Sequence, residues 1–231
     1  MKTALITGAS RGIGAAVARE LGRDHRILVG ATTQEGAQAV VDTLADAAPF
    51  VVDLTDPAAL AEATADIDRL DVLVHSAGVA PHVSVEGADP EQWRQSFGIN
   101  VFAVAELTRL LLPALRTARG TVVAINSGSG HHSGAGNAIY SGTKFALRAF
   151  TDALREEELG RLRVTSVHPG RVDTDMQRKL QADMGNHEYD GSRYLRPESI
   201  AAAVRLAVDA TADATVQEIS VRPSGLGDAR G

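Results

Sequence analysis

Short apolar runs alternate with segments of helical periodicity along the whole chain, and this alternation restricts the possible folds more than any other feature. Most of the runs are apolar at nearly every position, as strands are when helices cover both faces of a parallel sheet. The intervening segments carry apolar residues every three or four positions, which is typical of amphipathic helices. The runs with the length of strands are 4–7, 26–29, 50–52, 72–75, 121–125, 164–167 and 216–221.

This pattern predicts an α/β protein of the Rossmann type, with a doubly wound, parallel, seven-stranded sheet and helices on both faces. The length of 231 residues also allows two small domains. No linker or low-complexity stretch interrupts the alternation, so we expect a single domain over residues 1–231. Only the segment 175–196 has neither clear strand nor clear helix character. Because it follows a strand end, where open α/β sheets bind ligands, we expect a substrate lid there.

The composition argues against several classes of function. The net charge is −6 and no basic block is present, so nucleic acid is not expected as a partner. The absence of cysteine excludes disulfides, thiolate metal sites and a cysteine nucleophile. Neither a run of 18 apolar residues nor a signal-peptide core occurs, which favours a cytoplasmic protein without a membrane partner.

A glycine-rich turn directly follows the first predicted strand and leads into a helical segment. At such a turn, backbone N–H groups can approach a pyrophosphate, and the helix N-terminus adds partial positive charge. The glycine spacing is GxxxGxG rather than the commoner GxGxxG, and such a cluster can also be a tight turn without a ligand. Its position at the first strand-to-helix connection favours dinucleotide binding. The residues of this candidate cradle are Gly8, Ser10, Arg11, Gly12, Ile13 and Gly14.

The residues after the second strand bear on the choice between NADP and NAD. An NAD site presents an acidic residue there to the ribose 2′-hydroxyl, but this chain has no carboxylate before Glu35. Arg11 can face a 2′-phosphate, and the hydroxyl of Thr32 can donate a hydrogen bond to it. We therefore expect NADP(H). In the alternative, Arg11 is merely solvated and Glu35 turns in, which would favour NAD(H).

Asp53 and Leu54 follow the third predicted strand and are also candidates for cofactor binding. The Asp53 carboxylate can accept a hydrogen bond from the adenine amino group. It can equally cap the helix that begins near Pro57. The sequence leaves both interpretations open.

Ser127 ends the fifth strand, and Tyr140 with Lys144 begins the next helix; these three form the candidate catalytic group. Positions i and i+4 share one helical face, so the ammonium can lie near the phenol. An adjacent cation favours phenolate and lowers a tyrosine pKa, while a serine hydroxyl can orient a carbonyl oxygen. Only three of the 23 Lys and Arg residues are lysines, and a lysine suits this task better than an arginine. Taken alone, the Tyr–Lys spacing is also that of an ordinary surface pair.

With these motifs in place, the chain resembles the short-chain dehydrogenase/reductase family from about residue 3 to residue 221. Asn100 matches a fourth catalytic position, and the glycine turn and a PGxVxT segment match cofactor motifs. The resemblance implies that Tyr140 exchanges a proton, that Lys144 lowers the phenol pKa and holds the nicotinamide ribose, and that Ser127 positions the substrate oxygen. It implies that Asn100 supports a water-linked proton path. It also implies NADP usage.

The resemblance implies further cofactor contacts after the fourth and sixth strands. Beyond the glycine cradle these are Ser76, Ala77, Gly78, Tyr140, Lys144, Pro169, Gly170, Val172 and Thr174. The chain departs from the family where an NNAG motif is usual and His75 and Ser76 stand in place of both asparagines. We expect this departure to change local hydrogen bonds and to spare the acid–base residues.

Several weaker signals complete the expectations. His131 and His132 lie in the loop before Tyr140, but with no partner cluster in the sequence we expect no metal site. Residues 156–158 are three consecutive glutamates, and we expect them to form a solvated helix end. The segments 90–116 and 138–158 resemble the helices that pair family subunits, so we expect a homodimer or homotetramer.

The sequence thus predicts an NADP(H)-dependent oxidoreductase that moves a hydride between nicotinamide and a carbonyl or secondary alcohol, with Tyr140 as the proton donor. A redox sensor that binds NADP(H) without turnover is one alternative, and an NAD(H)-preferring dehydrogenase is another. An epimerase or lyase on this scaffold is a third, although family members of that kind are usually longer. The substrate is a small molecule whose identity the sequence does not specify.

Overall fold

The computed structural model describes residues 1–186 and 188–225. Its strands are β1 (Lys2–Ile6), β2 (His25–Ala31), β3 (Ala47–Val51), β4 (Val72–His75), β5 (Thr121–Ile125), β6 (Arg163–Pro169) and β7 (Glu218–Val221). These strands form one parallel sheet in the order β3-β2-β1-β4-β5-β6-β7. The chain extends the sheet from β1 first to one side and then to the other, so the predicted doubly wound fold is confirmed.

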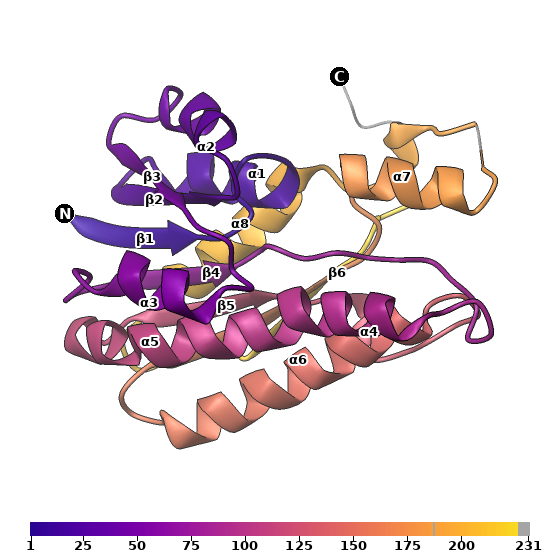
Figure 1. Cartoon of the computed structure of the whole chain (residues 1–231). Helices are drawn as coiled ribbons and strands as arrows, with labels where there is room; N and C mark the ends of the chain where they lie inside the picture. Colours follow the sequence, from indigo (N-terminus) through magenta and orange to yellow (C-terminus); the bar gives the residue numbers. More distant parts are fainter. Residues whose placement is uncertain (187, 226–231) are drawn as a thin grey trace.

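Helices cover both faces of this sheet. They are α1 (Gly12–Leu21), α2 (Gln34–Val41), α3 (Pro57–Thr64), α4 (Pro90–Phe97), the π-helical turn η1 (Gly98–Phe102), α5 (Ala103–Ala118), the 3₁₀ turn η2 (Gly128–Gly130), α6 (Ala138–Glu157), α7 (Asp175–Asp183), the 3₁₀ turn η3 (Gly191–Arg193) and α8 (Pro197–Val208). In Figure 1, α1, α2 and α8 lie on one side of the sheet, and α3, α5 and α6 lie on the other.

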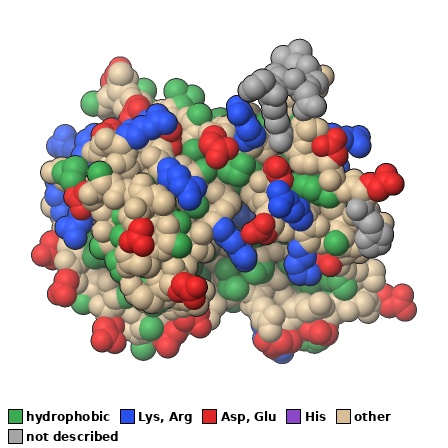
Figure 2. All heavy atoms as spheres, turned by 90° about the horizontal axis from the view of Figure 1, so that it is seen from above, with side chains coloured by type: hydrophobic (Ala, Val, Ile, Leu, Met, Phe, Trp, Pro, Cys, Tyr) green, Lys and Arg blue, Asp and Glu red, His purple; other side chains and the backbone are tan. Residues whose placement is uncertain are grey.

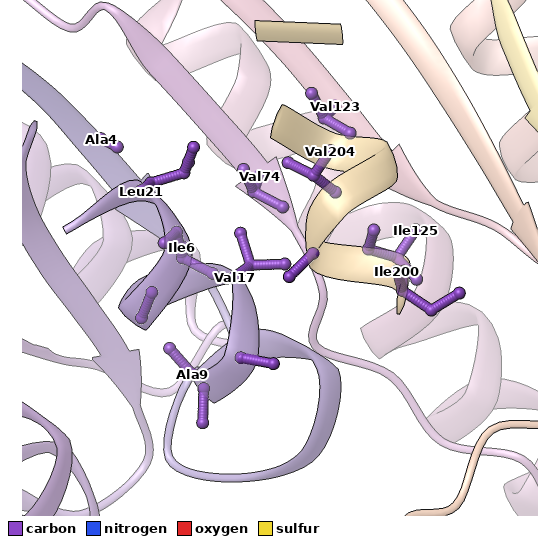
Figure 3. Packing of buried hydrophobic residues seen from close by; sticks show 14 of the residues in the cluster. Ala4, Ile6, Ala9, Val17, Leu21, Val74, Val123, Ile125, Ile200 and Val204 are labelled. Atoms are coloured by element: carbon purple, nitrogen blue, oxygen red, sulfur yellow. The ribbon is translucent and has the colours of Figure 1, made fainter. Parts of the chain in front are cut away.

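The apolar side chains of the strands divide between two cores because consecutive strand residues point to opposite faces. In β1, Ala4 and Ile6 join the cluster under α1 and α8, while Leu5 between them joins the cluster on the opposite face. Val17 of α1 and Val204 of α8 pack on the first of these faces (Figure 3). Burial on both faces explains why the strands read as continuous apolar runs.

The segment 175–196 is more ordered than the sequence predicts. Thr174 caps α7 through a hydrogen bond from the backbone N–H of Gln177, and a short turn, η3, follows. The expectation of a stretch without helical character is therefore wrong. The buried positions of α7 are Gln177 and Gln181, which are polar, so an apolar periodicity is missing from the sequence although the helix has a buried face.

The expected solvated run 156–158 is also corrected at its last residue. Glu158 is only 2% exposed, and its carboxylate accepts a bidentate pair of hydrogen bonds from Arg116 of α5 and lies 3.3 Å from Arg161. The Arg116 hydrogen bonds hold the pKa of Glu158 below its usual value, although burial opposes them. This carboxylate therefore ties the end of α6 to α5.

The helical stretch from Pro90 to Ala118 comprises α4, η1 and α5, and by length and composition it is able to cross a membrane. However, 44% of its most apolar window is buried inside the fold. Leu107, Leu111 and Leu115 of α5 belong to the core beneath the sheet. Packing therefore accounts for much of its hydropathy, and the absence of a membrane partner stays a prediction.

Candidate active site

The candidate residues gather at one edge of the sheet, because all seven strands are parallel and their carboxyl ends share that edge. The glycine turn follows β1, Thr32 follows β2, and Asp53 lies just beyond β3. The segment 76–78 follows β4, Ser127 follows β5, and the segment 169–174 continues β6. The topology thus brings residues that are far apart in the sequence to a single rim.

The glycine turn is shaped by close backbone approaches. Gly8 has a φ of +62°, and a Cβ there would lie 2.7 Å from the Cα of Ala77. A Cβ on Gly14 would collide with the carbonyl oxygen of Gly8. The Thr7 hydroxyl accepts hydrogen bonds from the N–H groups of Ser76 (3.1 Å) and Ala77 (3.2 Å). These contacts hold the segment after β4 against the turn even though both usual asparagines are missing.

The start of α1 is suited to an anion. Arg11 occupies the position before the helix without a side-chain cap, and no acidic residue lies in the first turn. The first N–H groups of a helix and its dipole favour negative charge, and the glycines leave room for a pyrophosphate. The residues present thus fit the diphosphate of a dinucleotide.

A cavity of about 500 Å³ adjoins the ends of β2 and β3. Its lining residues are Thr32, Val51, Val52, Asp53, Ala59, Glu62 and Ala63. Its size and its position beyond the glycine turn fit the adenosine end of the same dinucleotide. Thr32 and Asp53 are thus placed on one cavity, as the sequence interpretation requires.

One interpretation of Asp53 is wrong. The residue that caps α3 is Asp56, which accepts hydrogen bonds from the N–H groups of Ala58 and Ala59. Asp53 instead accepts from the backbone and the side chain of Thr55, and the backbone bond is the main reason why its pKa is lowered. Both bonds use the same oxygen, Oδ1.

Arg11 is free to meet a phosphate. Its side chain is 78% exposed, and its only ion pair with a described residue is a loose contact of 3.9 Å with the exposed carboxylate of Asp175. Thr33, next to Thr32, is occupied as the cap of α2 through a hydrogen bond from the N–H of Gly36. Thr32 is the hydroxyl on this segment that lines the adenosine cavity.

Ser127, Tyr140 and Lys144 come together between β5 and α6. The Ser127 and Tyr140 side chains share a hydrogen bond. The Lys144 ammonium donates to the carbonyl oxygen of Ile125 at 2.9 Å and lies 5.7 Å from the centre of the Tyr140 ring. The Ser127 hydroxyl also accepts from the N–H of Ser129 at 3.1 Å. A hydroxyl, a phenol and an ammonium thus face one small region.

Burial dominates the titration of this group. Burial raises the pKa of Tyr140, and the hydrogen bond with Ser127 only partly opposes it. Burial also lowers the pKa of Lys144 to about 8. Burial outweighs the other influences on the phenol pKa in the described structure, and the expectation that Lys144 lowers that pKa stays a prediction. A phenol that remains protonated at neutral pH is suited to donating a proton.

Asn100 is a buried connector within the π-helical turn η1. Its amide oxygen accepts from the N–H of Val79, and its amide nitrogen donates to the carbonyl oxygen of Val79, both at 2.9 Å. The same nitrogen donates at 3.0 Å to the hydroxyl of Thr143, which in turn donates to the carbonyl oxygen of Tyr140. Asn100 therefore positions the start of α6 and the segment after β4.

The segment after β6 closes toward the glycine turn. A Cβ on Gly12 would lie 3.4 Å from Thr174, so the turn and the cap of α7 are in near contact. The N–H of Gly170 donates to the carbonyl oxygen of Val221 at 2.7 Å, and Val172 pairs with Leu195. These contacts fix the segment 169–174 between the glycine turn and the end of β7.

Sequence reasoning missed two residues that support Ser127. The His168 ring binds the carbonyl oxygen of Ser127 through Nδ1 at 3.0 Å, and the Arg222 guanidinium binds the carbonyl oxygen of His168. The position of His168 directly before Pro169 was the available signal. Arg222 could not be found in this way, because it lies beyond β7, far from Ser127 in the sequence.

The structure gives His131 partners that the sequence does not reveal. Ligand atoms of His131, His168 and Glu218 lie within 4.8 Å of one another, and the two rings are 4.3 Å apart. The Glu218 carboxylate, however, lies 3.4 Å from Nε of Arg148, so a cation of the protein already faces it. The premise that His131 has no partners is thus wrong, while the expected absence of a metal stays a prediction.

Comparison with known proteins identifies the class of this chain. Residues 2–185 match the family model for short chain dehydrogenases. The 3-oxoacyl-[acyl-carrier-protein] reductase FabG of Escherichia coli is 34% identical over 190 residues, which cover 79% of this chain and 78% of the reductase.

Solved structures show the same relationship. An alcohol dehydrogenase from the archaeon Thermococcus sibiricus, complexed with 5-hydroxy-NADP, superposes with a TM-score of 0.88 at 26% identity and covers 97% of both chains. A serine dehydrogenase complexed with NADP+ superposes with a TM-score of 0.88 at 28% identity and covers 95% of this chain and 94% of its own. The chain belongs to the short-chain dehydrogenase/reductase family, a family of oxidoreductases.

Proposed function

We propose that this oxidoreductase uses NADP(H) to interconvert a carbonyl compound and a secondary alcohol. One observation carries the proposal: Ser127, Tyr140 and Lys144 converge at the end of β5, on the same rim as a glycine turn shaped for a pyrophosphate. The relatives solved with NADP or its derivative support a nicotinamide dinucleotide.

In the reducing direction, a nicotinamide dinucleotide held at this rim would supply the hydride that reduces the carbonyl carbon. Ser127 orients the carbonyl oxygen through its hydroxyl, and Tyr140 gives its phenolic proton to that oxygen as negative charge develops there. The product is the alcohol, and a proton from solvent restores the phenol. Lys144 supplies positive charge beside the phenolate that forms.

Asn100 acts in this scheme as a positioning residue. Its hydrogen bonds to Val79 and Thr143 fix the segment after β4 against the first turn of α6, where Tyr140 lies. We retain the expectation of a water-linked proton path at this position. The segment 169–174, closed against Gly12, would cover the nicotinamide end of the site and exclude water.

The preference for NADP(H) rests on Arg11, which is exposed beside the glycine turn, and on Thr32, which lines the cavity at the ends of β2 and β3. Arg11→Ala should weaken NADPH binding by about ten- to a hundredfold, because a charge-assisted hydrogen bond contributes roughly 1.5–3 kcal/mol. NADH affinity should change by less than about threefold. Fluorescence titration of both cofactors measures this, with the exposed Arg19 of α1 replaced by Ala as the charge-matched control. An equal loss for both cofactors would exclude a 2′-phosphate contact at Arg11.

Turnover separates this proposal from a redox sensor that only binds the cofactor. The protein is incubated with NADPH carrying deuterium at the transferable position and with a panel of aldehydes and ketones. The proposal expects an alcohol with deuterium on the carbinol carbon, detected by mass spectrometry. Tight cofactor binding with no labelled alcohol across the panel would favour the sensor.

The setting of the enzyme is part of the same proposal. We expect a cytoplasmic homodimer or homotetramer that acts on a small molecule, without a nucleic acid or membrane partner. Phe102 and Phe145, which are 63% and 45% exposed on the long helical elements, are apolar surface that a second subunit can cover.

A further inference from the structure

A second cavity, of about 510 Å³, lies between the end of β6, the region of α7 and η3, and the end of β7. Its lining residues are Gly170, Arg171, Gln181, Asn186, Arg193, Tyr194, Arg222 and Pro223. It is separate from the adenosine cavity at the ends of β2 and β3 and shares no lining residue with it. Nothing in the proposed hydride transfer uses its arginines.

The charge of this cavity is unusual for the chain. Three guanidinium groups line it, and among the residues that the structure describes no carboxylate does, although the chain carries a net charge of −6. Figure 2 shows Asp and Glu side chains as well as Lys and Arg side chains on the face seen from above. Within residues 1–186 and 188–225, no carboxylate forms an ion pair with Arg171, Arg193 or Arg222 at 4 Å or less. Such a cationic concavity attracts and holds an anion.

Two amide side chains, Gln181 and Asn186, also line the cavity and suit an oxyanion. Gln181 is only 5% exposed, and Asn186 donates a hydrogen bond to its side-chain oxygen at 2.8 Å, which orients the Gln181 amide group. Gln177, one turn earlier on α7, is 8% exposed, and its amide nitrogen has no hydrogen-bond partner in the described structure. Guanidinium forks and amide N–H groups are the donors that carboxylates and phosphates prefer.

The cavity adjoins the catalytic serine. Arg222 binds the carbonyl oxygen of His168, and the His168 ring binds the carbonyl oxygen of Ser127. A Cβ on Gly128, the residue after Ser127, would lie 3.1 Å from the Arg222 guanidinium. A substrate whose carbonyl oxygen meets Ser127 can therefore extend toward these arginines.

We propose that the substrate of this enzyme carries a carboxylate or phosphate group, and that Arg171, Arg193 and Arg222 bind that group while the carbonyl lies at Ser127 and Tyr140. This inference rests on the proposed carbonyl reduction. It adds the charge of the substrate, which the hydride transfer itself does not determine. The arginines act on binding and orientation, so they should change KM more than kcat for a charged substrate.

Matched pairs of substrates test the charge. The keto acids 2-oxobutanoate, acetoacetate and 4-oxopentanoate are compared with their methyl esters, and dihydroxyacetone phosphate is compared with dihydroxyacetone, all with NADPH. At least one acid or phosphate should exceed its neutral partner in kcat/KM by about tenfold or more, and the ratio should fall as salt is added. The pair with the largest ratio distinguishes carboxylate from phosphate. Turnover of neutral compounds with no preference for any charged partner would overturn the inference and leave the proposed function intact.

Substitutions of the arginines test whether they cause the preference for charged substrates. Arg193→Gln and Arg171→Gln should each lower the charged-to-neutral ratio about tenfold through KM, and Arg193→Lys should restore part of it. Arg23→Gln, at an exposed arginine beyond α1, is the charge-matched control and should keep the ratio of the original protein. A ratio that is the same in all four variants would contradict the assignment of the arginines.

A binding measurement does not depend on turnover. Inorganic phosphate is titrated calorimetrically into the protein saturated with NADPH, so that the pyrophosphate site is filled. The inference expects phosphate binding that Arg193→Gln weakens and Arg23→Gln does not. If no carbonyl is reduced but this difference is found, the proposed function fails and the anion site stands. If Arg193→Gln leaves the affinity for phosphate unchanged, the proposed anion site is wrong.

Discussion

Tyr140→Phe should lower kcat for carbonyl reduction by about 10² to 10⁴-fold, the range over which a positioned general acid acts. The phenolic hydroxyl of Tyr140 carries the proton to be donated, and it shares a side-chain hydrogen bond with Ser127. Phenylalanine keeps the ring and its packing and removes only the hydroxyl. The loss should therefore fall on the chemical step, and KM should change little.

Cofactor affinity is the control for this substitution. NADPH binding to Tyr140→Phe should stay within about threefold of the original protein, because the proposed phosphate and adenosine sites lie on the glycine turn and at the ends of β2 and β3. Steady-state kinetics with a substrate found in the panel and fluorescence titration with NADPH measure the two quantities. Substantial residual turnover would remove Tyr140 from the role of proton donor.

Lys144→Met should nearly abolish turnover and at the same time stabilise the fold. The Lys144 side chain is 6% exposed, and burial lowers its pKa from 10.5 to about 8. Below pH 8 the buried lysine must carry its charge, and the depressed pKa means that the folded state binds this proton less well than the unfolded chain. The difference corresponds to about 3 kcal/mol at neutral pH.

Methionine fills a similar volume without a charge, but it leaves the carbonyl oxygen of Ile125 without its donor. We therefore expect the free energy of unfolding to rise by about 1–3 kcal/mol at pH 7. The pH dependence of the free energy of unfolding shows the direction of this effect. Between pH 8 and pH 10.5 the unfolded chain is still protonated at this lysine while the folded protein is not, so the stability of the original protein rises with pH.

The gain in free energy of unfolding from Lys144→Met should therefore be largest below pH 8 and should shrink toward pH 10.5. Denaturant unfolding at pH 7 and at pH 10 measures this difference in both proteins. A variant that is less stable at pH 7 would contradict the account of a lysine held in an unfavourable environment for the sake of the site.

The sequence predicts the sheet and the order of its chemical groups well, because both follow from local patterns. Continuous apolar strands such as β5 require cover on both faces, and Ser127 comes at the end of that strand whatever the details of packing. Tyr140 and Lys144 share a helical face for the same local reason. Parallel topology then brings these groups to one rim.

What the sequence does not predict depends on contacts between distant segments. Gln177 and Gln181 are buried although polar, so α7 has no apolar signature. The sequence offers Asp53 as a cap of α3, and only the backbone geometry shows that Asp56 holds that position instead. Glu158 is buried because Arg116, 42 residues earlier, reaches it. Arg222 meets the site through β7, which is the last strand added to the sheet.

The pKa of Tyr140 shows the same limit in the chemistry. The spacing of Tyr140 and Lys144 suggests a phenol made more acidic by a nearby cation. The structure shows that burial is the larger effect and raises the phenol pKa, while Lys144 itself loses basicity. Desolvation depends on the whole surrounding fold, and no local motif encodes it.

Titration of the purified protein with NADPH and with NADH, followed by nicotinamide fluorescence at fixed salt, tests the central claim most directly, because it requires no substrate. The account predicts saturable binding of both, with NADPH bound at least tenfold more tightly, a difference of about 1.4 kcal/mol. A preference for NADH would contradict the role given to Arg11 and Thr32. Binding of neither cofactor would contradict the proposed hydride transfer itself.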